Sequence, residues 1–165
     1  MIKQLIFGDA MKELESTRRI LERLPEEYMS WKPHDKSMTL EGLATHLINL
    51  LNWQIAIFQY LEFDLATVPQ RRQPLKTRAE VLEEFDANVS KLGKLLDECD
   101  EKMLDQEWIL RHGDHIVLRE PRAIALRTLG LSHMIHHRAQ IGVYFRLLDI
   151  PVPGIYGPSA DEEVQ

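Results

Sequence analysis

Four long segments of this chain carry the hydrophobic period of an amphipathic helix. They extend from about residue 2 to 24, 39 to 63, 77 to 97 and 121 to 148, and polar or proline-marked breaks separate them. Apolar residues recur within each segment at three- and four-residue spacing, which places them on one helical face. Helix-start signals support these boundaries: Thr39 suits an N-cap, Thr77 and Glu80 form a capping box, and Pro121 suits a first turn. The sequence therefore predicts an all-α four-helix bundle.

Strand signals are confined to the stretch between the third and fourth segments. Residues 108–118 predict a short hairpin that turns at Gly113 and Asp114. The two earlier connections span about 14 residues each, which is long enough for a crossover, so the helices need not follow a simple up-down-up-down order. We expect residues 1–165 to form a single domain.

Composition excludes several classes of protein. The chain has 26 acidic and 20 basic residues, a net charge of −6, which argues against a nucleic-acid-binding protein. Its single cysteine excludes a disulfide framework and a cysteine-rich zinc module. We find no apolar stretch long enough for a membrane span, and Asp9 and Lys12 come too early for the core of a signal peptide. We therefore expect a cytoplasmic protein without a nucleic-acid or membrane partner.

The fourth segment places two histidines on one face. His133 and His137 are four residues apart, so they differ by only about 40° around a helix and can share one metal ion. His136 projects about 60° to the other side of His133 and makes a rival pair with it. The apolar stripe around His133 favours His137, because it lies within the same arc as Leu126, Leu129, Tyr144, Leu147 and Leu148.

A metal site usually needs at least three protein ligands. His46, on the second segment, is the best third candidate, since it lies within about 60° of Leu43, Leu50, Trp53, Ile57 and Leu61 on an ideal helix. Burying three imidazoles without partners is costly, and a shared metal ion removes that cost. We predict His46, His133 and His137 as metal ligands, with one or more positions left for water. The other reading is a helical interaction module whose histidines are polar core residues.

Three stretches of the chain resemble the DinB/YfiT-like family. They are residues 24–46, with Leu24-Pro-Glu-Glu, Trp31-Lys-Pro and the run from Ser37 to His46; residues 133–140, His-Met-Ile-His-His-Arg-Ala-Gln; and residues 151–159, Pro-Val-Pro-Gly-Ile-Tyr-Gly-Pro-Ser. The resemblance covers most of the chain and departs where the family often has glycine, at Ala139. It implies a four-helix bundle, commonly dimeric, that holds a divalent metal at the positions of His46, His133 and His137. Members with known chemistry include thiol-dependent transferases and mycothiol-dependent maleylpyruvate isomerases.

A metal held by three nitrogens with open positions is suited to Lewis-acid chemistry. We therefore expect a metal-dependent enzyme, a thiol-dependent S-transferase or a hydrolase, that uses zinc or nickel and, for S-transfer, a low-molecular-weight thiol. The Gln140 amide is expected to form a hydrogen bond to a ligand or a bound water molecule, or else to pack on Tyr144. Asn49 and Trp53 are expected to line the pocket, or else to have a core or capping role. The alternative is a non-catalytic metal or small-ligand binding protein of the stress response.

Two of the segments are apolar on a second face as well. These positions are Ala44, Ile48, Leu51 and Ile55 on the second segment, and Ile124, Leu131, Ile135 and Gly142 on the fourth. A helix that is apolar on two sides is buried on two sides. The sequence therefore predicts a two-fold symmetric homodimer, with a long loop covering these faces in a monomer as the alternative.

Overall fold

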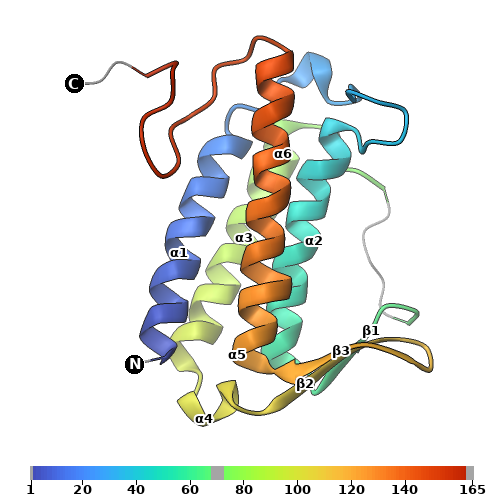
Figure 1. Ribbon diagram of the computed structural model, residues 1–165, viewed down its shortest axis with the longest axis vertical. Helices are drawn as coiled ribbons and strands as arrows, with labels where there is room; N and C mark the ends of the chain where they lie inside the picture. The colour runs from blue at the N-terminus through green and yellow to red at the C-terminus, as the bar shows by residue number, and fades with distance from the viewer. Residues whose placement is uncertain (1, 68–72, 163–165) are drawn as a thin grey trace.

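The computed structural model describes residues 2–67 and 73–162, and the side chains from residue 8 onward within those ranges. Four long helices form a bundle (Figure 1), which confirms the predicted fold class. They are α1 (Ile2–Leu21), α2 (Leu40–Gln59), α3 (Arg78–Glu98) and α6 (His133–Leu147). A short 3-10 helix, η1 (Glu26–Tyr28), follows α1, and α4 (Glu101–Leu104) follows α3.

The bundle contains a crossover. Helices α1 and α6 run in one direction, and α2 and α3 run in the other (Figure 1). Helix α1 contacts α3 and α6, and α2 contacts the same two helices, so the consecutive helices α1 and α2 lie on a diagonal. Helix α2 ends and α3 begins at opposite ends of the bundle, so the order of the helices is not simple up-down-up-down, as the long linkers allowed (Figure 1).

Polar groups fix the ends of α2 and α3. Thr39 Oγ1 accepts a hydrogen bond from the Gly42 amide at 3.2 Å, and Thr77 forms the predicted capping box with Glu80. Helix α2 ends at Gln59, earlier than the predicted Phe63. The buried guanidinium of Arg122 donates to carbonyls at this end, those of Ile57 and Tyr60, and satisfies acceptors that the last turn leaves open.

A small sheet closes the end of the bundle to which α2 and α3 descend (Figure 1). The predicted hairpin is confirmed as β2 (Glu107–His112) and β3 (His115–Pro121), with a positive φ of 59° at Gly113 in the two-residue turn. An additional strand, β1 (Glu62–Asp64), pairs in parallel with β2. Three residues are too few to show an alternating pattern, so the sequence did not distinguish β1 from a continuation of α2.

The fourth predicted segment is helical throughout but not uniformly α-helical. It consists of α5 (Arg122–Ala125), the π-helical stretch η2 (Leu126–Ser132) and α6. A π turn takes in an extra residue and changes which side chains face the core. Gly130 lies within η2 at a tight contact with α2, where a Cβ atom would come within 2.6 Å of Gln54 Cγ.

The core-facing side of α6 differs from the predicted stripe centred on His133. Met134, Ile141 and Phe145 are fully buried, whereas Leu147, expected inside, is 59% exposed. The histidines lie at the edge of this core face, on the side of α2. Leu126 and Tyr144 are buried as predicted, but the predicted centre of the arc was wrong, because it was given to the polar imidazoles, whereas the most deeply buried side of α6 includes Met134, about 100° further round the helix.

The second apolar faces are largely covered within the chain. All four α2 positions, Ala44, Ile48, Leu51 and Ile55, are buried, and α2 packs on α3 as well as α6. On the fourth segment Leu131 is buried, and the open side of Gly142 faces Val152 of the C-terminal segment. Contacts within the chain therefore account for most of the positions that predicted a homodimer, but Ile124 stays exposed and Ile135 is half-buried.

Candidate metal centre

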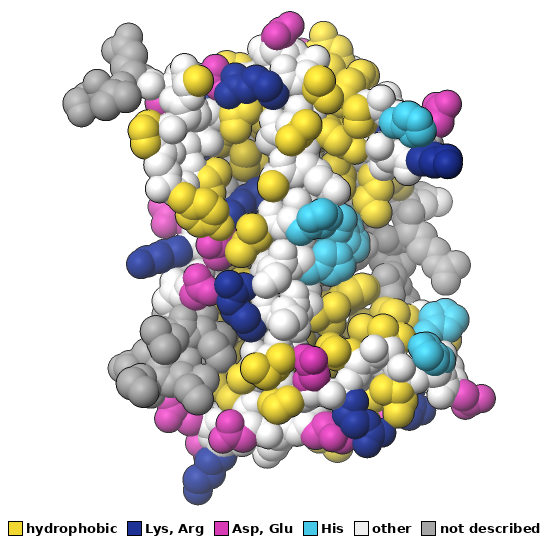
Figure 2. Space-filling model, viewed as in Figure 1, with side chains coloured by type: hydrophobic (Ala, Val, Ile, Leu, Met, Phe, Trp, Pro, Cys, Tyr) yellow, Lys and Arg dark blue, Asp and Glu magenta, His cyan; other side chains and the backbone are white. Residues whose placement is uncertain are grey.

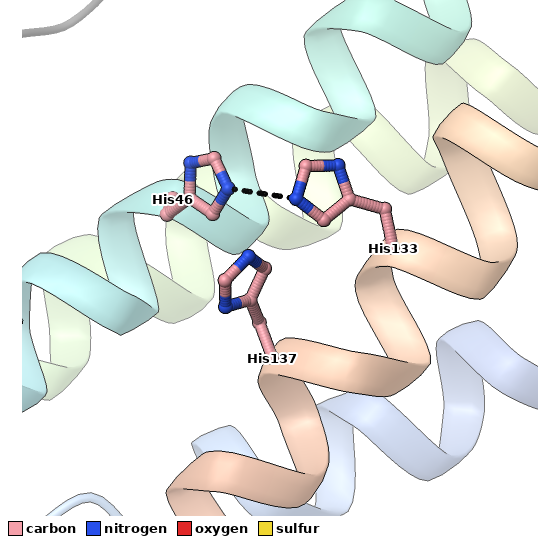
Figure 3. A group of neighbouring side chains, drawn as sticks. All are labelled: His46, His133 and His137. Carbon is pink, nitrogen blue, oxygen red and sulfur yellow. Dashed lines mark hydrogen bonds between the residues drawn. The ribbon is translucent and has the colours of Figure 1, made fainter.

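Three histidines from two helices meet at the face between α2 and α6. His46 lies on α2 and His133 and His137 on α6, and one ring nitrogen of each lies within 4.8 Å of the others. Figure 3 shows these nitrogens directed toward a common point. The Nε2 atoms of His46 and His133 are 3.4 Å apart. Two nitrogens bound to one ion at about 2.0–2.1 Å in tetrahedral geometry are separated by about 3.3–3.4 Å, so this spacing suits a shared ion.

All three imidazoles are half-buried and held in their neutral form. Burial lowers the pKa of His46 to about 4, and the nearby His137 and His133 add to the shift. Burial also lowers the pKa of His133, with further contributions from His137 and His136. The pKa of His137 is lowered by burial, against a smaller opposing effect of its hydrogen bond to Gln140. Neutral imidazole is the form that binds a metal ion.

Gln140 determines which nitrogen His137 presents. Its Oε1 lies 2.8 Å from His137 Nδ1, and an amide oxygen can only accept, so Nδ1 carries the hydrogen and Nε2 keeps its lone pair. The amide nitrogen of Gln140 lies 3.2 Å from Nε2 of the exposed His136. A hydrogen bond of this kind orients a metal-binding histidine. Gln140 is therefore placed to support His137, and His136 lies outside the cluster.

Trp53 and Asn49, which were also expected near the site, both lie on α2. The Trp53 ring stands 6.4 Å from that of His46 and 6.3 Å from that of His133, centroid to centroid, so it forms one wall of the cluster. Asn49 is half-buried on α2, one turn from His46. The remaining histidines, His34, His112 and His115, are exposed away from the cluster.

A pocket of about 270 Å³ adjoins the cluster. It shares His137 and Gln140 with the centre, and its other walls come from the loop before α2, from α2 itself and from α6: Lys36, Ser37, Met38, Leu43 and Tyr144. Figure 2 shows histidine side chains reaching the surface in the middle of this face of the molecule. The loop residues of this pocket were not predictable from the sequence, because no periodicity places a loop against a helix.

A second polar cluster lies on another side of α6. Arg138, directly after His137, is 3% exposed and pairs with Glu13 of α1 at 2.7 Å. Tyr156 of the C-terminal segment joins them: its hydroxyl accepts from the Arg138 guanidinium at 2.7 Å and lies 2.9 Å from both carboxylate oxygens of Glu13. Thr17 lies 3.4 Å from the same guanidinium. This cluster was not predicted from the sequence, because it joins residues of α1 to residues more than 120 positions later in the chain.

The donor set of the histidine cluster fits a divalent metal ion of intermediate softness. Three neutral imidazoles suit zinc and nickel. Within residues 8–67 and 73–162, this is the only group of three or more histidine, cysteine or acidic side chains whose donor atoms converge in this way. A helical bundle with a three-histidine cluster between two of its helices places this chain among candidate metal-binding bundle proteins.

Comparison with known proteins assigns the chain to a family. The model of the DinB family matches residues 5–164, so the chain belongs to the DinB family. The uncharacterized protein YjoA of Bacillus subtilis is 25% identical over 130 residues, which cover 79% of this chain and 80% of YjoA.

Solved structures of DinB-like proteins share the fold. One from Bacillus cereus is 23% identical, with a TM-score of 0.74 over 92% of this chain and 95% of its own. That of YjoA from Bacillus subtilis is 19% identical, with a TM-score of 0.66 over 90% and 96%. A third, from Exiguobacterium sibiricum, is 17% identical, with a TM-score of 0.65 over 92% and 94%. Among the described helices, none is long and apolar enough to cross a membrane.

Proposed function

We propose that this protein is a metal-dependent enzyme, an S-transferase that uses a low-molecular-weight thiol or a hydrolase, built on a three-histidine centre. The observation that carries the proposal is the convergence of one nitrogen each from His46, His133 and His137. Among the described residues no carboxylate shares this group, and three neutral donors would leave a divalent ion with its full positive charge. Such an ion supplies Lewis-acid chemistry, which favours the deprotonated form of a thiol or a water molecule at neutral pH.

The surrounding side chains support this chemistry. Gln140 keeps the Nε2 lone pair of His137 directed at the cluster. The Trp53 ring, whose centroid lies 6.4 Å from that of Phe63, forms an aromatic wall beside His46 and His133. The adjoining pocket leaves room for a small molecule that touches His137. Zinc and nickel are both candidates for the ion.

Turnover by the metal-loaded protein tests this proposal. Zinc- or nickel-loaded protein is incubated with a thiol and a panel of electrophiles, and thiol consumption is followed; activated esters test hydrolysis in parallel. We expect consumption that His137→Ala abolishes and His115→Ala leaves unchanged, since His115 is an exposed hairpin residue. Bound metal without turnover in any assay would instead favour a non-catalytic metal or small-ligand binding protein of the stress response.

A homodimer remains a prediction for this chain. On the fourth segment, the exposed apolar side chains include Val143 and Leu147, one turn apart on α6, and Ile124 on α5. Sedimentation equilibrium at micromolar concentration gives the answer directly. A species of twice the 19.3 kDa chain mass supports the dimer, and a clean 19.3 kDa species excludes it.

A further inference from the structure

The pocket beside the histidines has a fixed wall. The loop before α2 is fastened to the bundle by Leu40 and Glu41, whose amides donate to the carbonyls of Trp31 and Met29 at 2.9 and 2.8 Å. Tyr144 of α6 donates from its hydroxyl to the Met38 carbonyl at 3.1 Å. Lys36, Ser37 and Met38 therefore face the pocket from a loop that is held against the helix bearing His137.

Lys36 is the only charged side chain among the residues that line this pocket. Among the described residues, no carboxylate forms an ion pair with its ammonium group. Lys32, on the same loop, differs, because its ammonium lies 2.8 Å from the Asp35 carbonyl and 3.8 Å from the Asp35 carboxylate. In a chain with a net charge of −6, an unpaired cation beside a cluster of neutral imidazoles is a specific local feature.

We propose that this pocket is the substrate subsite and that it takes a small anionic molecule, with the anionic group on Lys36 and the reacting end at the histidine centre. Ser37 and Gln140 offer hydrogen bonds along the way, and Leu43 and Met38 contact the apolar part. The volume of about 270 Å³ is just below the range of typical small-molecule sites, so it fits a compact molecule. The inference rests on the proposed function, because it requires an ion at the histidines.

A matched pair of thiols tests the subsite. Cobalt-loaded protein is titrated with 3-mercaptopropionate and with its neutral amide, 3-mercaptopropionamide, and binding is followed by the thiolate-to-cobalt absorption band and by calorimetry. The ratio of the two affinities is compared among the unaltered protein, Lys36→Gln and, as a control, Lys32→Gln. An exposed ion pair is worth a small factor, so we expect Lys36→Gln to lower the preference for the carboxylate about two- to fivefold. Lys32→Gln should leave it unchanged, and added salt should reduce it in the unaltered protein.

The possible results distinguish a failure of the anion subsite from a failure of the metal-dependent function. An unchanged ratio in Lys36→Gln, or an equal loss in Lys32→Gln, overturns the assignment of Lys36. Cobalt bound at the histidines without a band from either thiol overturns the subsite and leaves the metal centre in place. Failure to bind cobalt at all removes the proposed function, and the subsite falls with it.

Discussion

Two polar clusters on α6 lie next to each other in sequence and have opposite chemistry. One cluster consists of Arg138, Glu13 and Tyr156. The buried Arg138 guanidinium forms an ion pair with the Glu13 carboxylate, and the Tyr156 hydroxyl is hydrogen-bonded to both. His137, one residue earlier, belongs to a set of three bases that no described carboxylate joins. In the first cluster the charges and hydrogen-bonding groups pair with one another. In the second cluster three nitrogen lone pairs lie close together, and a bound cation or proton is needed to pair with them.

The difference indicates which cluster holds the fold and which binds a ligand. The Arg138 cluster ties α1, α6 and the C-terminal segment together, so its loss should appear as lost stability. The histidine cluster concentrates desolvated bases, so it contributes little to the stability of the metal-free chain and much to ligand binding. Substitutions in the two clusters should therefore give opposite patterns.

The largest expected effect is on stability, at Arg138. Arg138→Met leaves the Glu13 carboxylate buried without its partner and should lower the free energy of unfolding by about 3–5 kcal/mol, measured by urea denaturation. The double variant Glu13→Leu/Arg138→Met should recover most of the loss, since it removes both charges. In the metal-free protein His133→Leu should cost nothing comparable. Equal losses in His133→Leu and Arg138→Met would remove the distinction between the clusters.

Gln140→Leu should weaken metal binding and spare the fold. Without the amide oxygen, His137 loses the hydrogen bond that fixes its tautomer, and the affinity for zinc should fall about 10- to 100-fold. Competition with a chromophoric chelator measures this change. Stability of the metal-free variant is the control, and an affinity equal to that of the unaltered protein would show that Gln140 does not orient His137.

Tyr156→Phe tests the contribution of the C-terminal segment. The variant keeps the ring over Arg138 and removes only the hydroxyl that Glu13 and Arg138 share. We expect a loss of about 1–2 kcal/mol in the free energy of unfolding, because the remaining ion pair loses one partner. Metal affinity should not change. A drop in metal affinity would show that the two clusters are energetically coupled.

The smallest expected effect is a pH dependence in the metal-free protein. Because the pKa of His46 is lowered from 6.5 to about 4, the unfolded chain binds more protons than the folded chain between these values. Stability from this residue is present above about pH 6.5 and is lost as the pH falls toward 4. His46→Leu should flatten the change in urea midpoint between pH 7 and 5. An identical slope in both proteins would show that His46 titrates normally. Partial exposure of the ring keeps this effect small.

Much of the fold was predictable because its signals are local. Periodicity placed the four helices, the capping box at Thr77 placed the start of α3, and Gly113 and Asp114 placed the hairpin turn. The three histidines were predictable because i, i+4 spacing on α6 and one apolar face on α2 limit the possible pairs. Strand β1, by contrast, exists only because β2 lies beside it.

Features that depend on contacts between distant segments escaped prediction. The π-helical stretch before His133 and the burial of Met134 and Phe145 were not predicted, because both depend on how the fourth segment packs on the other helices. The burial of Glu13 against Arg138 likewise depends on how α1 packs on α6. The pocket residue Lys36 lies in a loop whose position is fixed by contacts of Trp31 and Tyr144.

The metal content of the purified protein shows whether the three histidines form a metal site. Protein prepared without a histidine tag and without chelator is analysed for elements beside the His133→Ala variant. We predict close to one zinc, nickel or similar ion per chain in the unaltered protein and almost none in the variant. No bound metal, together with no uptake when zinc or nickel is added, would contradict the account and leave the three histidines as polar residues at the edge of the core.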